Sequence, residues 1–151
     1  MGAVTKVVID TNLFISAFGW DGKPEAVLRL MEQRRIRNHT TDEIFDELRR
    51  VVAYPKLKFP PALQVKILEF VFCWSTLVQA VELVAVVAAD PDDDKFIACA
   101  LAAGASHIIS GDPHLLAVGS YQDILILTPA QFIDSFNSPA SRLKNSASGM
   151  P

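Results

Sequence analysis

Three consecutive β-branched residues near the start of the chain place the tightest limit on its fold. Val7, Val8 and Ile9 follow one another without a polar interruption, as expected for a strand that is covered on both faces. Further short apolar runs follow along the chain, and stretches with helical spacing separate them. This alternation predicts an α/β fold, namely a single three-layer α/β/α domain with a central, mostly parallel sheet.

The order of the expected elements follows from this alternation. Strands are expected at 4–10, 36–40, 83–87, 107–110 and 124–127. Helices are expected at 12–17, 24–31, 40–53, 62–80, 90–104 and 129–136. The strand at 36–40 is the weakest prediction, because Asn38 and His39 are poor residues for the interior of a sheet. Residues 137–151 show no apolar period, so we expect a disordered tail after a folded domain of residues 1–136.

The helix expected at 62–80 is unusual because it is apolar on nearly every face. Such a helix lies either deep in the core or partly under another subunit. Of these two alternatives we favour the second, and we expect this helix to contribute to a homodimer contact.

The sequence also bears on where the protein is located. Lys6 stands where an N-myristoylation signal needs Ser or Thr, and a strand pattern begins too early for a cleaved signal peptide. Residues 70–89 are apolar but carry polar interruptions, so a buried helix and a strand fit them better than a membrane span. Cys73 and Cys99 have no disulfide or metal spacing and are expected to be core thiols. We therefore expect a cytoplasmic protein with no membrane partner.

Charged side chains are distributed unevenly, although the net charge is only −3. Residues 1–66 carry eleven basic against eight acidic side chains, whereas residues 67–136 carry one against nine. An acidic centre beside a basic flank suits an enzyme that binds metal ions and a polyanion together. Solvated helix faces would produce the same distribution, so composition alone leaves both interpretations open.

Two aspartates end apolar runs that are expected to be strands. Asp10 directly follows Val7–Ile9, and Asp112 follows the run at 107–110. A charged side chain at the end of a buried strand is costly unless something compensates it. Open α/β sheets bind their ligands at the carboxyl edge of the strands. Either aspartate alone could be a turn residue, but together they predict a pair of carboxylates at one edge of the sheet.

A third acid, Glu47, is expected to face inward from its helix. It lies within the apolar stripe formed by Ile44, Leu48 and Val51, whereas Asp46 falls on the solvent side. The dipole and capping roles that account for acids in a first turn do not apply at this position. Glu47 is therefore the acid of this helix whose position calls for a partner.

A fourth acid comes from the run Asp92-Asp93-Asp94, at the start of the helix that Pro91 opens. The helix dipole stabilises acids in a first turn by about 0.3–1 kcal/mol each. Three consecutive aspartates exceed that need, which favours a functional role for at least one of them. Helical periodicity does not choose among the three.

Carboxylates that converge repel one another unless a cation lies between them. Oxygen ligands without a His or Cys cluster favour Mg²⁺ or Mn²⁺ over zinc. Such centres activate a water molecule and stabilise a leaving oxygen. Hydrolysis of a phosphodiester bond is the reaction that this arrangement serves best.

Four segments in order resemble the motifs of PIN domains, and most closely those of the bacterial VapC-like toxins of toxin–antitoxin pairs. The resemblance extends over residues 4–136, and each motif alone is weak evidence, whereas four at suitable spacing are strong. They are Val8-Ile9-Asp10-Thr11-Asn12, Glu47-Leu48-Arg49-Arg50-Val51, the segment 90–100 beginning Asp90-Pro91-Asp92-Asp93-Asp94, and Ser110-Gly111-Asp112.

The resemblance implies a Mg²⁺- or Mn²⁺-dependent ribonuclease whose catalytic and metal-binding acids are Asp10, Glu47, Asp94 and Asp112. It selects Asp94 from the aspartate run, since the family's acid stands three residues before an Ile-like position and six before an Ala position. Ile97 and Ala100 occupy those positions here. It also implies an RNA substrate and, for a toxin, an antitoxin protein as partner.

Further residues are assigned supporting roles. Asn12, Ser110 and Asp93 are expected to orient the acids or the scissile phosphate. Basic side chains are candidate contacts to the RNA backbone, because neutralised phosphates supply most nonspecific affinity; they are Arg34, Arg35, Arg37, Arg49, Arg50, Lys56 and Lys58. Of these we expect Arg49 and Arg50 to make the contacts, since they follow Glu47 on one helix.

The sequence also departs from the family pattern. His114 stands where the family often has an acid, which puts a second metal site in doubt. His39, His107 and His114 are expected to be structural or surface residues rather than ligands. Asn38 and His39 replace an expected apolar strand.

Several other functions compete with this interpretation. A haloacid-dehalogenase-like phosphatase needs an acid at position 12, and a receiver domain needs a lysine after its last core strand; Asn12 and the segment 127–129 exclude them. A PIN nuclease that processes RNA without a toxin role stays an alternative. So does a non-catalytic PIN-fold binding module, although the presence of all four acids disfavours it.

Overall fold

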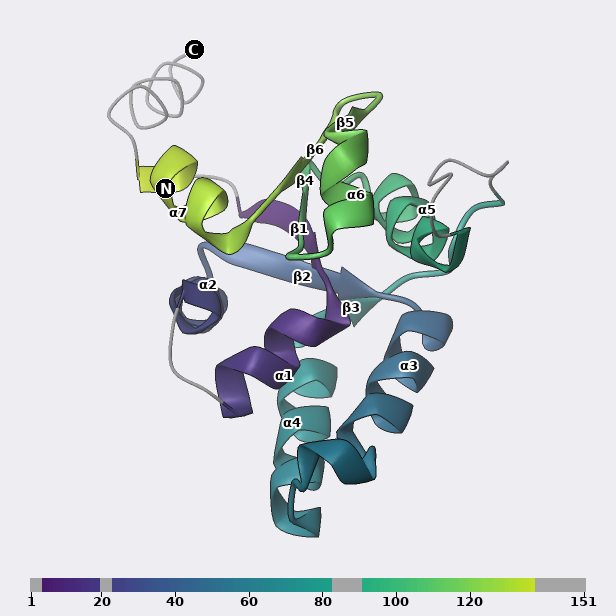
Figure 1. Ribbon diagram of the computed structural model, residues 1–151. Coiled ribbons are helices and arrows are strands. Elements are labelled where there is room, and N and C mark those ends of the chain that lie inside the picture. Colours follow the sequence, from purple (N-terminus) through teal and green to yellow (C-terminus); the bar gives the residue numbers. More distant parts are fainter. Residues whose placement is uncertain (1–3, 20–22, 83–90, 138–151) are drawn as a thin grey trace.

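The computed structural model describes residues 4–19, 23–82 and 91–137 (Figure 1). Two single-turn 3₁₀ helices occupy Pro55–Leu57 and Pro91–Asp93. The other elements are β1 (Thr5–Ile9), α1 (Thr11–Gly19), α2 (Lys23–Glu32), β2 (Ile36–Thr40), α3 (Asp42–Val52), α4 (Pro61–Trp74), β3 (Ser75–Leu77), α5 (Asp94–Ala103), β4 (His107–Ile109), α6 (Pro113–Val118), β5 (Ser120–Tyr121), β6 (Ile124–Leu127) and α7 (Pro129–Asn137).

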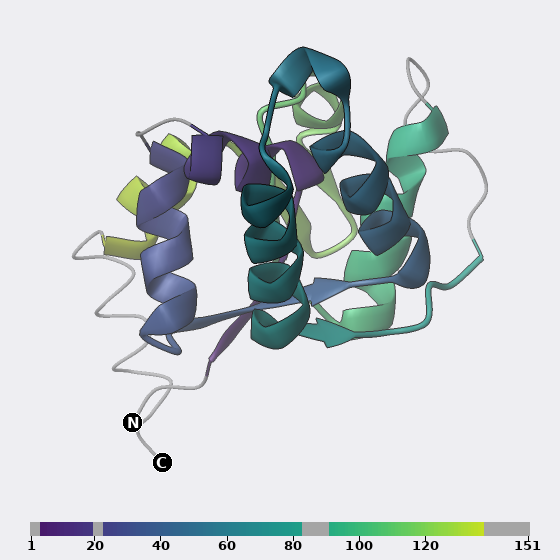
Figure 2. The same cartoon turned by 90° about the horizontal axis from the view of Figure 1, so that it is seen from below.

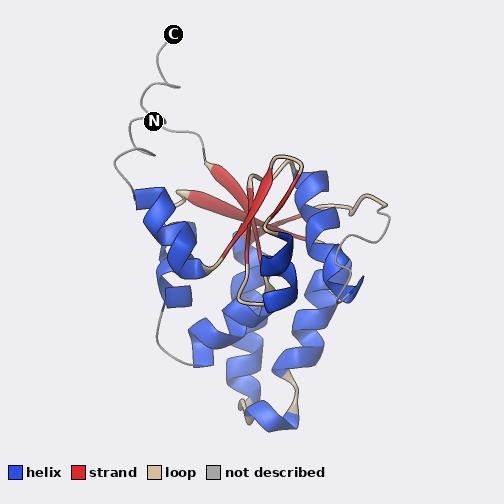
Figure 3. Cartoon of the chain, turned by 45° about the horizontal axis from the view of Figure 1, so that its top comes forward, coloured by secondary structure: helices blue, strands red, loops and turns tan. Residues whose placement is uncertain are grey.

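The strands form one sheet in the order β3-β2-β1-β4-β6-β5. All neighbours are parallel except β5, which runs antiparallel to β6. Figure 3 shows the strands in the middle of the molecule with helices around them. This mixed α/β architecture with a mostly parallel central sheet confirms the predicted fold class.

Strand β1 divides the core into two parts because its side chains alternate between the faces of the sheet. Val7 and Ile9 pack on one face with residues of α1, α2, α4 and α7. Val8 packs on the other face with residues of α5, α6 and β6. All three side chains are at most 1% exposed, as their apolar run predicts. The view from below shows α4 lying between α2 and α3 (Figure 2).

Strand β2 lies inside the sheet, where its polar residues complete hydrogen bonds that the strands leave open. Asn38 is 1% exposed. Its Oδ1 accepts a hydrogen bond of 2.8 Å from the backbone N–H of Ile9, and its Nδ2 donates one of 2.9 Å to Ser75 Oγ. His39 Nδ1 lies 3.3 Å from the carbonyl oxygen of Val7. The residues that made this strand a weak prediction therefore tie it to both of its neighbours.

The predicted helix at 62–80 is wrong at its carboxyl end. Helix α4 ends at Trp74, and Ser75–Leu77 form β3, which pairs in parallel with β2. Thr76 Oγ1 accepts a hydrogen bond of 2.8 Å from Arg37 Nε across this pair. Strand pairing with a distant segment overrides the apolar helical spacing here, which a single sequence does not reveal. The strand expected at 83–87 lies outside the described residues.

Other expectations have mixed outcomes. Residues 90–104 contain a 3₁₀ turn before α5, and α6 and β5 occur where no element is expected. Cys99 is buried, which raises the pKa of its thiol to about 12, but Cys73 is exposed, so the expected core thiol at 73 is wrong. No helix within the described ranges is long and apolar enough to cross a membrane. The tail from 138 lies outside them, so the domain boundary stays a prediction.

We predict that Asn38→Ala lowers the free energy of unfolding by about 2–3 kcal/mol, because it leaves the buried N–H of Ile9 without its acceptor. Urea denaturation measures this loss. Ser75→Ala is the matched control, since it removes only the second bond of Asn38 and should cost no more than about 1.5 kcal/mol. Equal losses in the two variants would contradict the role given to Asn38.

Candidate metal centre

Two of the predicted acids meet at the carboxyl edge of neighbouring strands. Asp10 follows β1 directly, and Asp112 stands three residues after β4, whose Ile109 is paired with Ile9. Both aspartates line a cavity of about 490 Å³. The other residues around this cavity are Asn12, Leu13, Ser16, Gly111, Pro113 and His114. The sheet therefore delivers both carboxylates to one hollow, as their positions in the sequence predict.

Asp10 is buried, and polar neighbours hold it in place. Only 4% of the residue is exposed. Oδ2 accepts a hydrogen bond of 2.7 Å from Ser110 Oγ, and Oδ1 accepts one of 3.2 Å from the backbone N–H of Asn12. Ser110 Oγ also accepts a hydrogen bond of 2.9 Å from the backbone N–H of Asp112. Ser110 thus links the two acidic segments from a fully buried position.

Burial and neighbouring negative charges both disfavour the charged form of Asp10. Burial raises the pKa of Asp10 above the ordinary value of 3.8, because the charged carboxylate is removed from water. The hydrogen bonds from Ser110 and Asn12 act in the opposite direction. The charges of Glu47 and Asp112 raise the pKa further. These carboxylates, which are far apart in the sequence, are therefore close enough in the fold to repel one another.

Glu47 faces inward from α3, as its apolar stripe predicts, and its carboxylate has partners in the chain. Its Oε2 accepts a hydrogen bond of 3.0 Å from Thr11 Oγ1. Its Oε1 lies 3.1 Å from Lys95 Nζ, in an ion pair where the Glu47 side chain is 24% exposed and that of Lys95 only 3%. Glu47 is thus placed between the end of β1 and the start of α5, with access to water retained.

Lys95 is a component of this site that the sequence interpretation missed. Its ammonium bridges Glu47 and Asp92, with the second pair at 2.8 Å. Burial lowers the pKa of Lys95, but its hydrogen bonds to Asp92 and Glu47 and the charges of these acids outweigh burial, so the pKa is raised. Lys95 is therefore charged and neutralises part of the acidic centre. The signal in the sequence is a lysine that directly precedes the apolar run of α5.

The aspartate run contributes differently at each position. Asp92 is exposed, Asp93 is buried and Asp94 is partly buried. Ligand atoms of Asp93, Asp112 and His114 all lie within 4.8 Å of one another, a geometry that could hold a metal ion. Sequence reasoning gave Asp93 only a supporting role and expected His114 to be a structural or surface residue. The assignment of Asp94 as a metal ligand stays a prediction.

The predicted RNA contacts lie on the outer side of α3. Arg49 and Arg50 are exposed and, with Glu43 and Asp46, surround a shallow surface hollow. Arg49 Nη2 lies 3.2 Å from Asp46 Oδ1, and Arg50 Nε donates a hydrogen bond of 3.4 Å to the carbonyl oxygen of Asp46. Exposed pairs of this kind are weak, so both guanidinium groups can exchange these partners for phosphates. Their contact with RNA stays a prediction.

We predict that Asp10→Asn stabilises the protein by about 1 kcal/mol at neutral pH in the presence of a chelator, because burial penalises a carboxylate more than an amide. The raised folded-state pKa means that wild-type Asp10 destabilises the fold above that pKa. The difference between the proteins should therefore shrink as pH falls toward 3.8, the ordinary value of the group. Urea denaturation at a series of pH values measures the difference.

Divalent ions should reverse this order of stability. Mg²⁺ or Mn²⁺ at 100 times its dissociation constant should stabilise wild type by about 2.7 kcal/mol, and the variant by much less. The repulsion inferred at Asp10 would be contradicted if Asp10→Asn were less stable than wild type in chelator and neither ion changed the stability of wild type.

Comparisons with known proteins place this geometry in a family. The family model described as "PIN domain" matches residues 6–114, a range that includes Asp10, Glu47, Asp94 and Asp112. An uncharacterized protein of Methanocaldococcus jannaschii is 32% identical over 142 residues, which cover 87% of this chain and 91% of the relative. PIN domains are generally metal-dependent nucleases, which agrees with an acidic group able to hold a metal ion. The chain belongs to the PIN domain family.

Proposed function

We propose that this protein is an endoribonuclease that hydrolyses RNA phosphodiester bonds with the help of Mg²⁺ or Mn²⁺. The observation that carries the proposal is the buried carboxylate of Asp10, which lines a cavity that is open to solvent. The negative charges of Glu47 and Asp112 repel this carboxylate. Burying a charge among like charges is unfavourable unless a cation compensates them. A divalent cation bound by oxygen atoms supplies this compensation.

The acids of this centre fit such an ion, and two of them, Asp10 and Asp112, line the cavity. Asp10, Glu47, Asp94 and Asp112 are the proposed ligands, and the buried Asp93 is an additional candidate beside Asp112 and His114. An oxygen ligand set favours Mg²⁺ or Mn²⁺, whereas participation of His114 would favour Mn²⁺ over Mg²⁺. When bound, the metal supplies activation of water and stabilisation of negative charge on the phosphate.

The chain's own groups prepare this chemistry. Ser110 donates to Oδ2 of Asp10 and fixes the orientation of that carboxylate. Thr11 and Lys95 hold the two oxygens of Glu47. Because Lys95 neutralises one negative charge of the group, less positive charge is needed from bound ions than four free carboxylates would require. We therefore favour one tightly bound metal ion over two.

We propose Arg49 and Arg50 as contacts to the RNA backbone. Their exposure on α3, the helix that carries Glu47, supports this role. Arginine binds phosphate through parallel N–H groups in a fixed fork, and such contacts add affinity without selecting a sequence.

The biological role is proposed from the sequence motifs, which resemble those of VapC-like toxins. In that role an antitoxin protein would bind this chain and block the cavity. A PIN nuclease that processes RNA without a toxin role is the alternative, and a gene for a small antitoxin beside this one would favour the toxin. The presence of all four acids in the chain, two of which line the cavity, supports an enzyme over a binding module.

A homodimer remains part of this proposal because apolar residues are exposed on and next to α4. Val65 and Phe72 are 53% and 70% exposed, and Leu77 in β3 is 59% exposed. Phe72 packs edge-on against Phe45 of α3, with ring centroids 6.0 Å apart. A monomer mass in light scattering at high protein concentration would remove the dimer from the proposal.

We predict that the purified protein cleaves single-stranded RNA with Mg²⁺ or Mn²⁺ and loses this activity in chelator. Asp10→Asn should reduce the cleavage rate by more than the roughly 10–100-fold typical of residues that only orient a ligand, whereas Ser110→Ala should fall within that range. A gel assay with a labelled RNA measures the rates. Equal cleavage by wild type and Asp10→Asn would mean that a contaminant cuts the RNA.

Matched acidic variants complete this test. Glu47→Gln should impair cleavage, whereas Asp134→Asn, at an exposed position of α7 outside the candidate centre, should leave it unchanged. Asp94→Asn should weaken Mn²⁺ binding more than Asp92→Asn does in a calorimetric titration. If Asp93→Asn weakened Mn²⁺ binding more than Asp94→Asn does, Asp93 would replace Asp94 as the proposed ligand.

A further inference from the structure

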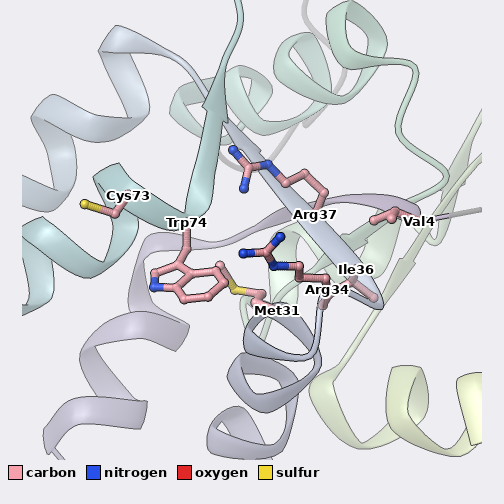
Figure 4. Close-up of a pocket in the computed structure, with 7 residues that line it drawn as sticks. All are labelled: Val4, Met31, Arg34, Ile36, Arg37, Cys73 and Trp74. Atoms are coloured by element: carbon pink, nitrogen blue, oxygen red, sulfur yellow. The ribbon is translucent and has the colours of Figure 1, made fainter.

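A second cavity, of about 530 Å³, lies between the carboxyl end of α4 and the amino ends of β1 and β2 (Figure 4). Val4 and Ile36, at the amino ends of β1 and β2, form part of its wall, together with Met31, Arg34, Arg37 and Trp74. The acids follow the carboxyl end of β1, and this strand of five residues spans about 17 Å. The two cavities are therefore separate sites.

Two arginines give this cavity its charge. Arg34 follows α2 and Arg37 lies in β2, and Figure 4 shows the guanidinium of Arg34 near Trp74 and that of Arg37 beside β3, the strand that follows α4. Arg37 Nε donates to Thr76, which leaves its terminal nitrogens available. Among the residues described by the structure, no carboxylate forms an ion pair with either arginine. Two adjacent cations without a counter-ion form a binding site for an anion, and the guanidinium fork suits phosphate.

The backbone at Arg34 has a conformation that costs any residue except glycine some strain. Arg34 has φ +59°, in the left-handed region. Its N–H donates to the carbonyl of Met31, and the N–H of Arg35 donates to that of Leu30, the two bonds of a Schellman motif. Glycine is the residue usually found at this position. Strained residues cluster at functional sites, so an arginine here is consistent with a use for its side chain.

The floor of the cavity is aromatic and apolar. The indole of Trp74 is partly exposed, and Figure 4 shows the sulfur of Met31 beside it, whereas Cys73 points away. Trp74 also packs against Phe70, with centroids 6.1 Å apart and planes 30° from parallel, which limits the movement of the indole. A partly exposed indole whose movement is limited offers a stacking surface for a flat ring, and every nucleobase has a face that can stack.

From these features we propose that this cavity binds a nucleotide, with its phosphate on Arg34 and Arg37 and its base against Trp74. A phosphate alone would use the two cations but not the indole, and an apolar ligand would leave the cations without a partner. A nucleotide uses both. The same unit occurs in a free mononucleotide and in a single-stranded nucleic acid, so both sources fit the cavity.

This site is independent of the proposed nuclease activity, because no carboxylate of the candidate metal centre contributes to it. Binding can therefore be measured in chelator, where no cleavage is expected. The variant Asp10→Asn should bind a nucleotide as wild type does. Loss of nuclease activity with retained nucleotide binding would separate the two proposals.

The test is calorimetric titration of the full-length protein with adenosine 5′-monophosphate in chelator. We expect saturable binding that becomes at least about tenfold weaker in Arg34→Gly and in Arg37→Gln, as expected for a lost charge-assisted hydrogen bond. Arg34→Gly relaxes the left-handed backbone, so its weaker binding would not reflect unfolding. Trp74→Leu should also weaken binding, and adenosine and ribose 5-phosphate should each bind less tightly than the intact nucleotide.

Arg35→Gln is the matched control, because it removes the same charge from the same segment outside the cavity. Arg35 lies over the ring of Phe136, with Cζ 4.8 Å from its centroid, and this variant should bind as wild type does. A short oligodeoxyadenylate without a terminal phosphate distinguishes the sources: tighter binding than the mononucleotide indicates a strand, and weaker binding a free nucleotide. Absence of binding at millimolar concentration, or equal affinities in wild type, Arg34→Gly and Arg37→Gln, would overturn the proposal.

Discussion

The carboxylate of Asp10 is shielded from water at the end of β1, where the charges of Glu47 and Asp112 repel it. Its position follows from the fold, because the apolar residues of β1 must be covered on both faces and the next residue must emerge at the edge of the sheet. Ser110 and the backbone of Asn12 satisfy its two oxygens but do not remove the charge. The rest of the candidate centre is organised around this charge.

Lys95 connects the acidic centre to the helical layer. Its ammonium lies between Glu47 of α3 and Asp92 at the start of α5, while the neighbouring Phe96 and Ile97 belong to the core. A buried ion pair is costly to desolvate, and removing one partner of such a pair is more costly still. The pair therefore makes the placement of Glu47 depend on α5, so that folding and assembly of the site are coupled.

Groups of opposite charge lie at the two edges of the sheet. Negative groups gather at the carboxyl edge around Asp10 and Asp112, and two arginines without acidic partners among the described residues lie at the amino edge beside Trp74. This separation agrees with the uneven distribution of charge along the chain, whose first part is basic and whose later part is acidic. It places the proposed metal centre and the proposed nucleotide site at opposite ends of the central strands.

Much of this arrangement could be predicted from local patterns. The apolar run before Asp10, the run before Asp112 and the stripe around Glu47 each depend on periodicity, and the structure contains all three. The end of α4 at Trp74 could not be predicted, because the pairing of Ser75–Leu77 with β2 is a contact between distant segments. Asn38 made the strand at 36–40 a weak prediction for the same reason, because its hydrogen bonds are contacts with distant segments, namely the two neighbouring strands. The role of Lys95 depends on the meeting of α5 with α3, and those of Asp93 and His114 on the approach of the 3₁₀ turn Pro91–Asp93 to α6, which periodicity does not encode.

The central claim is that these acids converge around a divalent cation. Anomalous diffraction from crystals grown with Mn²⁺ tests it most directly. The account predicts a peak between the carboxylates of Asp10 and Asp112, with metal–oxygen distances of about 2.0–2.6 Å. Complete anomalous data with no peak in this cavity, or with Mn²⁺ only at exposed acids such as Asp46, would contradict it.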